Sequence, residues 1–461
     1  MAALLGPKLA IARGAGALSR LRGSGATSLP GRVLMRLEPD AISTLGGRLA
    51  EGSVVISATN GKTTTAAMAA GILSGQGIEL VHNSAGANMA GGVATALLDA
   101  AAPGQRIAGR LGLFEVDELW LAGVADSLRP RVIVLGNLFR DQLDRYGELD
   151  AIADSWREVL LASDATAVLN ADDPLLADLG RERPDVLYYG VQDDSLELPG
   201  LAHAADAKHC RNCGSPYIFD AVYLGHLGRY HCASCGRTRP QPDLLATEVR
   251  LEGVRAVRFM LTTQDGTAEV RLGLPGLYNV YNALAAAALC SALGMSLAAI
   301  VAGLEATRPA FGRAETVTVS SARGPREMRI MLVKNPAGAN EVLRTLTLEQ
   351  GSHDLLGVLN DQIADGRDVS WIWDADFELL AGRVASVVCA GNRAADLATR
   401  LKYAGVEEAR LSVVPELPDA LEAASASGPR ERPLYALPTY TAMLALRELL
   451  GRRGEVAGRW S

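Results

Sequence analysis

The residues from Ser57 to Thr65 read Ser-Ala-Thr-Asn-Gly-Lys-Thr-Thr-Thr and have the side chains that a phosphate-binding loop needs. In such loops a glycine lets the backbone approach the anion, a lysine reaches the β- and γ-phosphates, and a hydroxyl ligates Mg²⁺. We assign the last two roles to Lys62 and Thr63. The first glycine of the usual G-x-x-x-x-G-K-[ST] pattern is Ser57 here, and an ordinary turn is the alternative interpretation.

The sequence on either side of this loop favours nucleotide binding. An apolar run, 54–56, precedes the loop, and an alanine-rich stretch, 66–73, follows it. A strand, a turn and a helix in this order point backbone N–H groups and the positive end of a helix dipole at the anion. The predicted nucleotide contacts in the loop are Thr59, Asn60, Gly61, Lys62, Thr63 and Thr64.

Acidic side chains follow several of the expected strands. Glu115 is placed to hold Mg²⁺. Asp141 and Asp144 are three residues apart, so one helical turn would put them on the same face. Asp172 and Asp173 could bind a ribose or make a turn. For each of these acids alone, a helix cap or a solvated turn is the alternative.

Four cysteines have the spacing of a zinc ribbon, C-x2-C-x18-C-x2-C, with a glycine after each pair. Because all four ligands would be thiolates, no position is open for substrate, and the site is predicted to be structural. His209 and His231 precede the pairs and are not expected to be ligands. Four unrelated thiols are the alternative. The predicted zinc ligands are Cys210, Cys213, Cys232 and Cys235.

The elements that must position these residues alternate between strand and helix, which predicts an α/β fold with a parallel sheet that binds its ligand at the carboxyl ends of the strands. A second α/β pattern follows residue 310. We therefore predict a basic N-terminal segment, a central P-loop domain with a parallel sheet and an inserted ribbon, and a C-terminal α/β domain. Their ranges are 1–50, 51–310 (ribbon 205–240) and 311–461.

Composition limits the possible partners and location. The net charge of −7 gives no basic signature of nucleic-acid binding. The sequence has no uninterrupted run of 18 or more apolar residues, so no membrane span is predicted. The first 36 residues carry six basic side chains and no acid, which suits a transit peptide, a segment lying on an anionic membrane, or a helix packed on the first domain. We expect a cytoplasmic protein, with peripheral contact at the inner face of the membrane as an open alternative.

Several motifs occur in the order found in the Mur ligases, and the sequence resembles that family. They are ATNGKTTT (58–65), GANM (86–89), NLFRDQLDRYGELD (137–150), LNADDP (169–174) and YNVYNALAA (278–286). The cysteine insertion and the motifs VKNPAGANEVL (333–343) and LNDQIADGRDVSWIWDADFE (359–378) are more similar to the ligase-like subunits of lipid II isoglutaminyl synthases. This second resemblance covers roughly residues 30–450.

The resemblance implies ATP-dependent amidation in peptidoglycan synthesis, with ATP, Mg²⁺ and Zn²⁺ as cofactors. ATP would convert the α-carboxylate of D-glutamate in the lipid II stem peptide, or in a muropeptide, to an acyl phosphate. Ammonia from a GatD-like glutaminase partner would then give D-isoglutamine. The resemblance places Asn279 and Asn282 near the adenine and Arg313 near the phosphates, with Lys62 and Glu115 neutralising charge.

The sequence departs from the amino-acid-adding Mur ligases in three places. Their DHLD motif has Gln142 in place of histidine, and their HNP triplet begins here with Lys334. No lysine of the central domain matches their carbamylated lysine. All three differences fit a ligase whose nucleophile is ammonia, and they weigh against a Mur-type or folylpolyglutamate-like amino-acid ligase, which is the alternative enzyme. A non-catalytic nucleotide-binding scaffold is the other alternative.

The chain has no convincing glutaminase of its own. Cys290 and Cys389 lie in apolar surroundings and are expected to be core residues. The resemblance implies that an aspartate of this subunit completes the partner's Cys–His pair, and the matching residue is Asp368, with Asp361 and Asp365 as the fallback candidates. An aspartate that only caps the next turn is the alternative.

Overall fold

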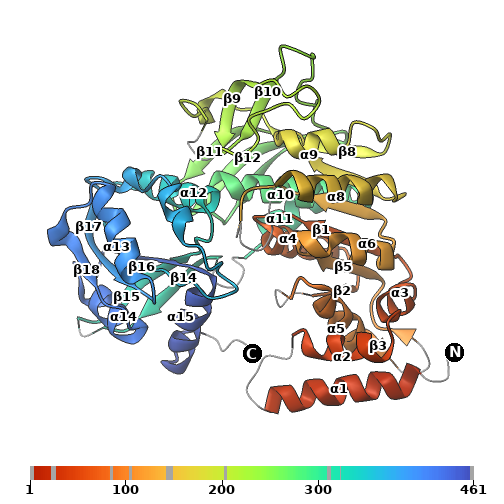
Figure 1. The fold of residues 1–461 in the computed structure, drawn as a ribbon, viewed down its shortest axis with the longest axis horizontal. Helices are drawn as coiled ribbons and strands as arrows, with labels where there is room; N and C mark the ends of the chain where they lie inside the picture. The colour runs from red at the N-terminus through yellow and green to blue at the C-terminus, as the bar shows by residue number, and fades with distance from the viewer. Residues whose placement is uncertain are drawn as a thin grey trace.

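The computed structural model describes residues 5–21, 27–83, 87–102, 106–141, 149–201, 205–308, 313–321 and 323–456. Two α/β units are visible in Figure 1, one coloured red to green and one teal to blue. Each consists of a mostly parallel sheet with helices on both faces. The predicted α/β class is therefore confirmed.

The central sheet has nine strands within the described residues, in the order β13-β12-β11-β8-β7-β6-β1-β5-β2. Neighbours from β2 to β11 are parallel, and β11, β12 and β13 are antiparallel. Every residue of β1, β5 and β6 is buried, as expected for parallel strands covered on both faces. The bounds are β1 (Ser53–Ser57), β2 (Leu80–His82), β5 (Leu111–Glu115), β6 (Val132–Leu135), β7 (Thr166–Asn170), β8 (Val186–Val191), β11 (Leu244–Glu252), β12 (Ala256–Thr263) and β13 (Gly266–Leu272).

Two hydrophobic clusters lie on the two faces of this sheet. One cluster contains α4 (Lys62–Gly75), α10 (Leu277–Ala292) and α11 (Leu297–Glu305). Alanines 285–288 of α10 are fully or almost fully buried, and their small side chains let α10 pack closely on α4. The other cluster contains α5 (Ala90–Ala100), α6 (Leu121–Leu128), α8 (Leu149–Leu161) and α9 (Pro174–Leu179).

The described N-terminal segment forms three helices, α1 (Leu5–Leu21), α2 (Leu29–Leu37) and α3 (Ala41–Gly46). In Figure 1, α1 and α2 lie at the bottom of the central unit and α3 lies at its right side. Leu5, Leu9 and Ala12 of α1 are buried with α2 and α5. Of the three interpretations of this segment, a helix packed on the first domain therefore describes the inner face of α1. Among the described helices, none is long and apolar enough to cross a bilayer.

The cysteine segment lies between β8 and β11 and contains the hairpin β9 (Ile218–Leu224) and β10 (Leu227–His231), which form a two-stranded sheet of their own. Figure 1 shows this hairpin at the top of the central unit. Because β11 pairs with β8, the chain leaves the central sheet and returns beside the strand it left. The insertion therefore interrupts the sequence and not the sheet.

The C-terminal unit is a six-stranded sheet in the order β14-β15-β19-β16-β17-β18, with only the β14–β15 pair antiparallel. Helices α12 and α13 pack on one face, and α14 and α15 on the other. The bounds are β14 (Arg313–Val319), β15 (Arg326–Met331), α12 (Pro336–Thr347), β16 (His353–Val358), β17 (Val384–Ala390), α13 (Ala394–Tyr403), β18 (Leu411–Val413), α14 (Leu417–Ala426), β19 (Leu434–Pro438) and α15 (Tyr440–Arg452).

Candidate active site

The phosphate-binding loop is the short connection between β1 and α4. Gly61 has a φ of 87°, a left-handed conformation that favours glycine, and a Cβ there would lie 2.0 Å from Asn282 Oδ1. Ser57 is fully buried in β1, and its carbonyl accepts a hydrogen bond from the Gly136 N–H at 2.9 Å. Ser57 is therefore a strand residue, so the glycine missing at this position does not alter the turn before α4.

The segment after β6 holds the loop in place. The Asn60 N–H donates to Asn137 Oδ1 at 2.8 Å, and Asn137 Nδ2 donates back to the Asn60 carbonyl at 2.9 Å. The Thr59 hydroxyl accepts from the Phe139 N–H at 3.1 Å. These pairs position the loop from the neighbouring strand.

Lys62 is buried at the start of α4 and donates to Glu118 Oε2 at 2.7 Å and to the Ala58 carbonyl. Burial by itself would lower the pKa of Lys62, but the Glu118 carboxylate raises it above its ordinary value. Burial would likewise raise the pKa of Glu118, but Lys62 and Lys334 hold it below its usual range. Both groups are therefore charged, and the lysine is positioned by a buried ion pair.

A cavity of about 390 Å³ opens over the loop. Glu115 is 1 % exposed, and its Oε2 has no hydrogen-bond partner within the described residues. An unpaired buried carboxylate oxygen in a cavity that Thr63 also lines fits a hard cation such as Mg²⁺. The residues that line the cavity include all the predicted loop contacts, Thr59, Asn60, Gly61, Lys62, Thr63 and Thr64, together with Glu115, Asn279 and Asn282.

Asn279 and Asn282 form a buried pair at the start of α10. Asn282 Nδ2 donates to Asn279 Oδ1 at 3.0 Å, and Asn279 Nδ2 donates to the Pro275 carbonyl at 2.7 Å. Asn282 Oδ1 also lies 3.4 Å from the Thr65 hydroxyl. The pair therefore lies against the phosphate-binding loop, and its place near the adenine stays a prediction.

The C-terminal unit completes the cavity. Lys334 Nζ donates to the Thr59 carbonyl at 2.9 Å and to the Asp141 carboxylate. Asn335 Nδ2 donates to Asn60 Oδ1 at 3.1 Å, and the Asn335 side chain caps α12. Lys334 and Asn335, at the first two positions of the triplet that matches HNP of the Mur ligases, thus contact the phosphate-binding loop directly. The Arg313 side chain is outside the described part of the structure, as is the whole of Asp144.

Three residues of this site were not predicted as site residues. Glu118 pairs with Lys62, Asn137 holds the loop, and Lys334 reaches it from the second unit. Glu118 and Asn137 belong to polar clusters that follow strands, which is the signal that could have identified them. Lys334 also follows a strand, β15, but nothing local in the sequence places the second unit on the first.

Asp172 and Asp173 have structural roles. Asp172 is fully buried and accepts from Arg239 at 2.5 Å and from the Tyr281 hydroxyl at 2.7 Å. Asp173 caps α9 through the Leu175 N–H at 3.0 Å. Of the two interpretations of this pair, a turn describes it better than a ribose site.

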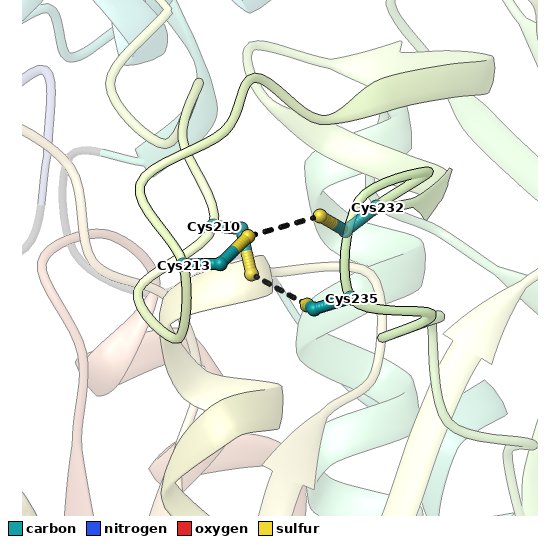
Figure 2. Close-up of side chains that lie close together, drawn as sticks. All are labelled: Cys210, Cys213, Cys232 and Cys235. Atoms are coloured by element: carbon teal, nitrogen blue, oxygen red, sulfur yellow. Dashed lines mark hydrogen bonds between the residues drawn. The ribbon is translucent and has the colours of Figure 1, made fainter.

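The four cysteines converge from two loops, as Figure 2 shows. Their Sγ atoms lie within 4.8 Å of one another, with Cys210 Sγ 3.6 Å from Cys235 Sγ and Cys213 Sγ 3.4 Å from Cys232 Sγ. With Zn–S bonds of about 2.3 Å, a tetrahedral site places its sulfurs about 3.8 Å apart. The thiols therefore fit a structural zinc ion. The ring of His231, which was not expected to be a ligand, contacts Asp220, with Nδ1 3.1 Å from Oδ2.

Asp368 does not line the cavity over the phosphate-binding loop and lies on an exposed loop of the C-terminal unit. Its carboxylate accepts from the Ser370 N–H at 2.8 Å, and this hydrogen bonding holds the pKa of Asp368 below its usual range. Asp365 is buried and accepts from the Thr441 N–H at 2.7 Å, whereas Asp361 binds Asn392.

Comparison with known proteins identifies the family. The Mur ligase middle domain matches residues 56–232, and the MurT ligase C-terminal domain matches residues 332–443. The subunit MurT of lipid II isoglutaminyl synthase (glutamine-hydrolyzing) from Streptococcus pneumoniae is 34 % identical over 442 residues, which cover 95 % of this chain and 94 % of that protein. The chain belongs to the MurT family. The MurT subunit from Staphylococcus aureus is 32 % identical over 439 residues, 95 % of each chain.

Solved structures similar to this MurT family member share its fold. A pseudomurein peptide ligase type C from Methanothermus fervidus has a TM-score of 0.68 at 23 % identity, over 89 % of this chain and 80 % of that one. Folylpolyglutamate synthase from Mycobacterium tuberculosis has a TM-score of 0.60 at 18 % identity, over 93 % and 99 % of the two chains. The predicted Mur ligase fold is confirmed. The assignment to an ATP-dependent ligase family rests on the matches to the Mur ligase middle domain and to the MurT subunits.

Proposed function

We propose that this chain is the synthetase subunit of a lipid II isoglutaminyl synthase. The observation that carries the proposal is the sequence similarity to two proteins named as MurT subunits of that enzyme. The similarity covers 95 % of this chain, at 34 % and 32 % identity. The cavity supports it, since a phosphate-binding loop, a buried lysine and an unpaired buried carboxylate lie together there. The substrate would be the D-glutamate α-carboxylate of the stem peptide on lipid II or on a soluble muropeptide.

The chemistry requires activation, because a carboxylate is a poor electrophile. An oxygen of the substrate carboxylate attacks the γ-phosphorus of ATP, ADP leaves, and an acyl phosphate forms. The nitrogen lone pair of ammonia then attacks the carbonyl carbon, phosphate leaves with its bridging oxygen, and the nitrogen loses a proton to give the amide. Lys62 would stabilise the charge on the transferred phosphoryl group, while Thr63 and Glu115 would hold Mg²⁺.

Lys62 must exchange partners during this reaction. It is paired with Glu118, so a bound phosphate would replace the carboxylate as its principal contact. This arrangement keeps the ammonium group charged and oriented before nucleotide binds, which lowers the reorganisation needed afterwards.

The ammonia would come from a glutaminase subunit of the GatD kind, docked on the C-terminal unit. Asp368 is the exposed member of the three candidate aspartates, and it is ionised near neutral pH. Exposed apolar side chains surround Asp368. Ile363 lies five residues before it and is 69 % exposed. Trp373 lines the same surface hollow as Asp368, and its ring lies 5.9 Å from that of the exposed Tyr403. An accessible carboxylate could orient the histidine of a partner's Cys–His pair.

The direct test is mass spectrometry of lipid II or a soluble muropeptide incubated with this chain, ATP and Mg²⁺. Product with ammonium alone, and with glutamine only when the glutaminase subunit is added, is the expected result. If ATP binds but no sample yields product, the chain is a scaffold or acts on another acyl group. If an amino acid is added in place of ammonia, the amino-acid ligase alternative is correct.

We also propose that α1 contacts an anionic membrane surface. Its outer face is apolar at helical spacing, with Ile11 58 % and Leu18 51 % exposed. Arg32 and Arg36 of α2 are exposed and would complement anionic lipid, whereas Lys8 is paired with Glu38 at 2.8 Å and Arg13 donates to the carbonyls of Leu98 and Ala101. Co-sedimentation with phosphatidylglycerol vesicles should fall about tenfold in Ile11→Ser/Leu18→Ser. Leu348→Ser, at a 46 % exposed leucine of the other unit, is the control, and equal binding by all three proteins would reject the contact.

A further inference from the structure

The tip of the zinc-ribbon hairpin lies in the wall of the nucleotide cavity. Leu224 ends β9 and Leu227 begins β10, so they flank the two-residue turn. Leu224 is 5 % and Leu227 1 % exposed, and both line the cavity. The cysteine-containing insertion between β8 and β11 thus supplies apolar surface to the candidate active site.

The turn itself packs on the segment that holds the phosphate-binding loop. The His226 ring is fully buried, with its centroid 4.7 Å from that of Phe139. Gly225 has a φ of 60°, and a Cβ there would lie 2.9 Å from the Phe139 ring. Because the Phe139 N–H donates to the Thr59 hydroxyl, two contacts connect the hairpin tip to the loop.

A second connection runs through Asp172. Arg239, four residues after the last ribbon cysteine, donates to Asp172 Oδ1 at 2.5 Å. The Tyr281 hydroxyl of α10 donates to the other oxygen at 2.7 Å, and Tyr281 lines the cavity. The Gly228 N–H donates to the Asp172 carbonyl at 3.0 Å. The hairpin and α10 are therefore fixed to the same buried carboxylate residue.

Two chemically different sets of side chains line the cavity. The phosphate-binding loop, Lys62 and Glu115 are polar, and Leu224, Leu227 and Leu274, which belong to one hydrophobic cluster, are apolar. When the polar set binds the phosphates of a nucleotide, the base requires an apolar wall. We propose that the ribbon hairpin forms that wall, so that Leu224 and Leu227 position the adenine of ATP.

This inference rests on the proposed function, since it assumes that ATP binds in the cavity. It also assigns a purpose to the zinc site. Cys232 directly follows β10, so a zinc ion would fix the open end of a hairpin whose closed end contacts the base. The ribbon would then be a positioning element for the nucleotide and not a separate docking module.

The test compares ATP with inorganic tripolyphosphate, which has the phosphates and no base. Leu227→Ala should weaken ATP binding about tenfold and leave tripolyphosphate binding unchanged. Ile218→Ala, at a 48 % exposed position near the far end of the same hairpin, is the matched control and should bind both as the unmodified chain does. Binding of both ligands is measured by calorimetry on the full chain.

Equal loss for ATP and tripolyphosphate, or no loss for either, would overturn the inference. Failure of the unmodified chain to bind ATP would instead reject the proposed function. If Leu227→Ala does not fold, Leu227→Met keeps the volume of the side chain and changes its shape. Leu227→Met should then change the ratio of the affinities for ATP and GTP. An unchanged ratio would overturn the inference that Leu227 contacts the base.

Discussion

Lys334 of the C-terminal unit donates to the carboxylate of Asp141 in the central unit, across 193 positions of sequence. The same ammonium group donates to the carbonyl of Thr59 in the phosphate-binding loop at 2.9 Å. One lysine thus connects the second unit to both the loop and an acid of the cavity. The relative position of the two units is therefore coupled to the nucleotide site.

Asp141 makes this contact dependent on pH. Burial raises the pKa of Asp141 above its ordinary value of 3.8, although Lys334 opposes the shift. Because the folded protein holds this proton more tightly than the unfolded chain, stability from this group is lost as pH rises from 3.8 through the raised pKa. The free energy of unfolding of Asp141→Asn should therefore increase relative to the unmodified chain across that window. Denaturant titrations at several pH values measure the difference, and a constant difference would contradict the prediction.

Gly61 tests the geometry of the phosphate-binding loop. Gly61→Ala would place a Cβ 2.0 Å from Asn282 Oδ1 at a φ of 87°, so the loop or the asparagine must move. We expect nucleotide affinity to fall at least about tenfold, measured by calorimetry. Gly75→Ala, at the C-terminal end of the helix α4 that follows the loop, is the control, because no atom lies within 4 Å of its added Cβ, and its affinity should not change. Similar affinities for the two variants would show that the loop tolerates a side chain.

Lys62 is predicted to have separable roles in stability and in catalysis. Lys62→Met leaves the buried Glu118 carboxylate without its closest cation, which should lower the free energy of unfolding by about 3 kcal/mol. Lys62→Met/Glu118→Gln removes both charges and should recover most of that stability. ATP turnover should stay at least about 100-fold below that of the unmodified chain in both variants. Turnover that recovers together with stability would mean that Lys62 acts only as a structural partner.

The parts of the fold that the sequence predicts well are those with a strong local signal. β6 is an uninterrupted buried apolar run, and β17 is apolar apart from Ser386. β8 was not predicted, since its sequence Val-Leu-Tyr-Tyr-Gly-Val contains a glycine, and its partner β11 follows an insertion of about 50 residues. Pairing across such an insertion depends on tertiary packing, and local propensity does not reveal it.

The candidate site shows the same limit. The loop residues follow β1 and Glu115 ends β5, so their convergence on one edge of the sheet was predictable. The contacts of Lys334 and of the Leu224–Leu227 turn were not, because each arrives from a unit whose placement has no local sequence signal. For Asp368 the sequence offered a family resemblance, and the structure adds its exposure.

The four ribbon cysteines should bind one zinc ion per chain. Cys213→Ser should lose the metal, as measured by elemental analysis, and should lower the melting temperature, because the two loops in Figure 2 are then no longer joined. Cys389→Ala is the control, since this buried thiol lies in β17, away from the ribbon, and should retain the zinc. Full zinc content in Cys213→Ser would contradict a four-thiolate site.

Asp368 distinguishes the two half-reactions. Asp368→Ala removes an exposed carboxylate that does not line the nucleotide cavity, so amidation driven by ammonium should be unchanged. Amidation driven by glutamine in the complex with the glutaminase subunit should fall on the order of 10³-fold, because the partner's histidine loses the group that orients it. Asp396→Ala, in the same surface hollow, is the control and should keep both activities. Loss of both activities in Asp368→Ala would mean that the residue supports the fold or the synthetase site, and retention of both would place the third member of the glutaminase triad elsewhere.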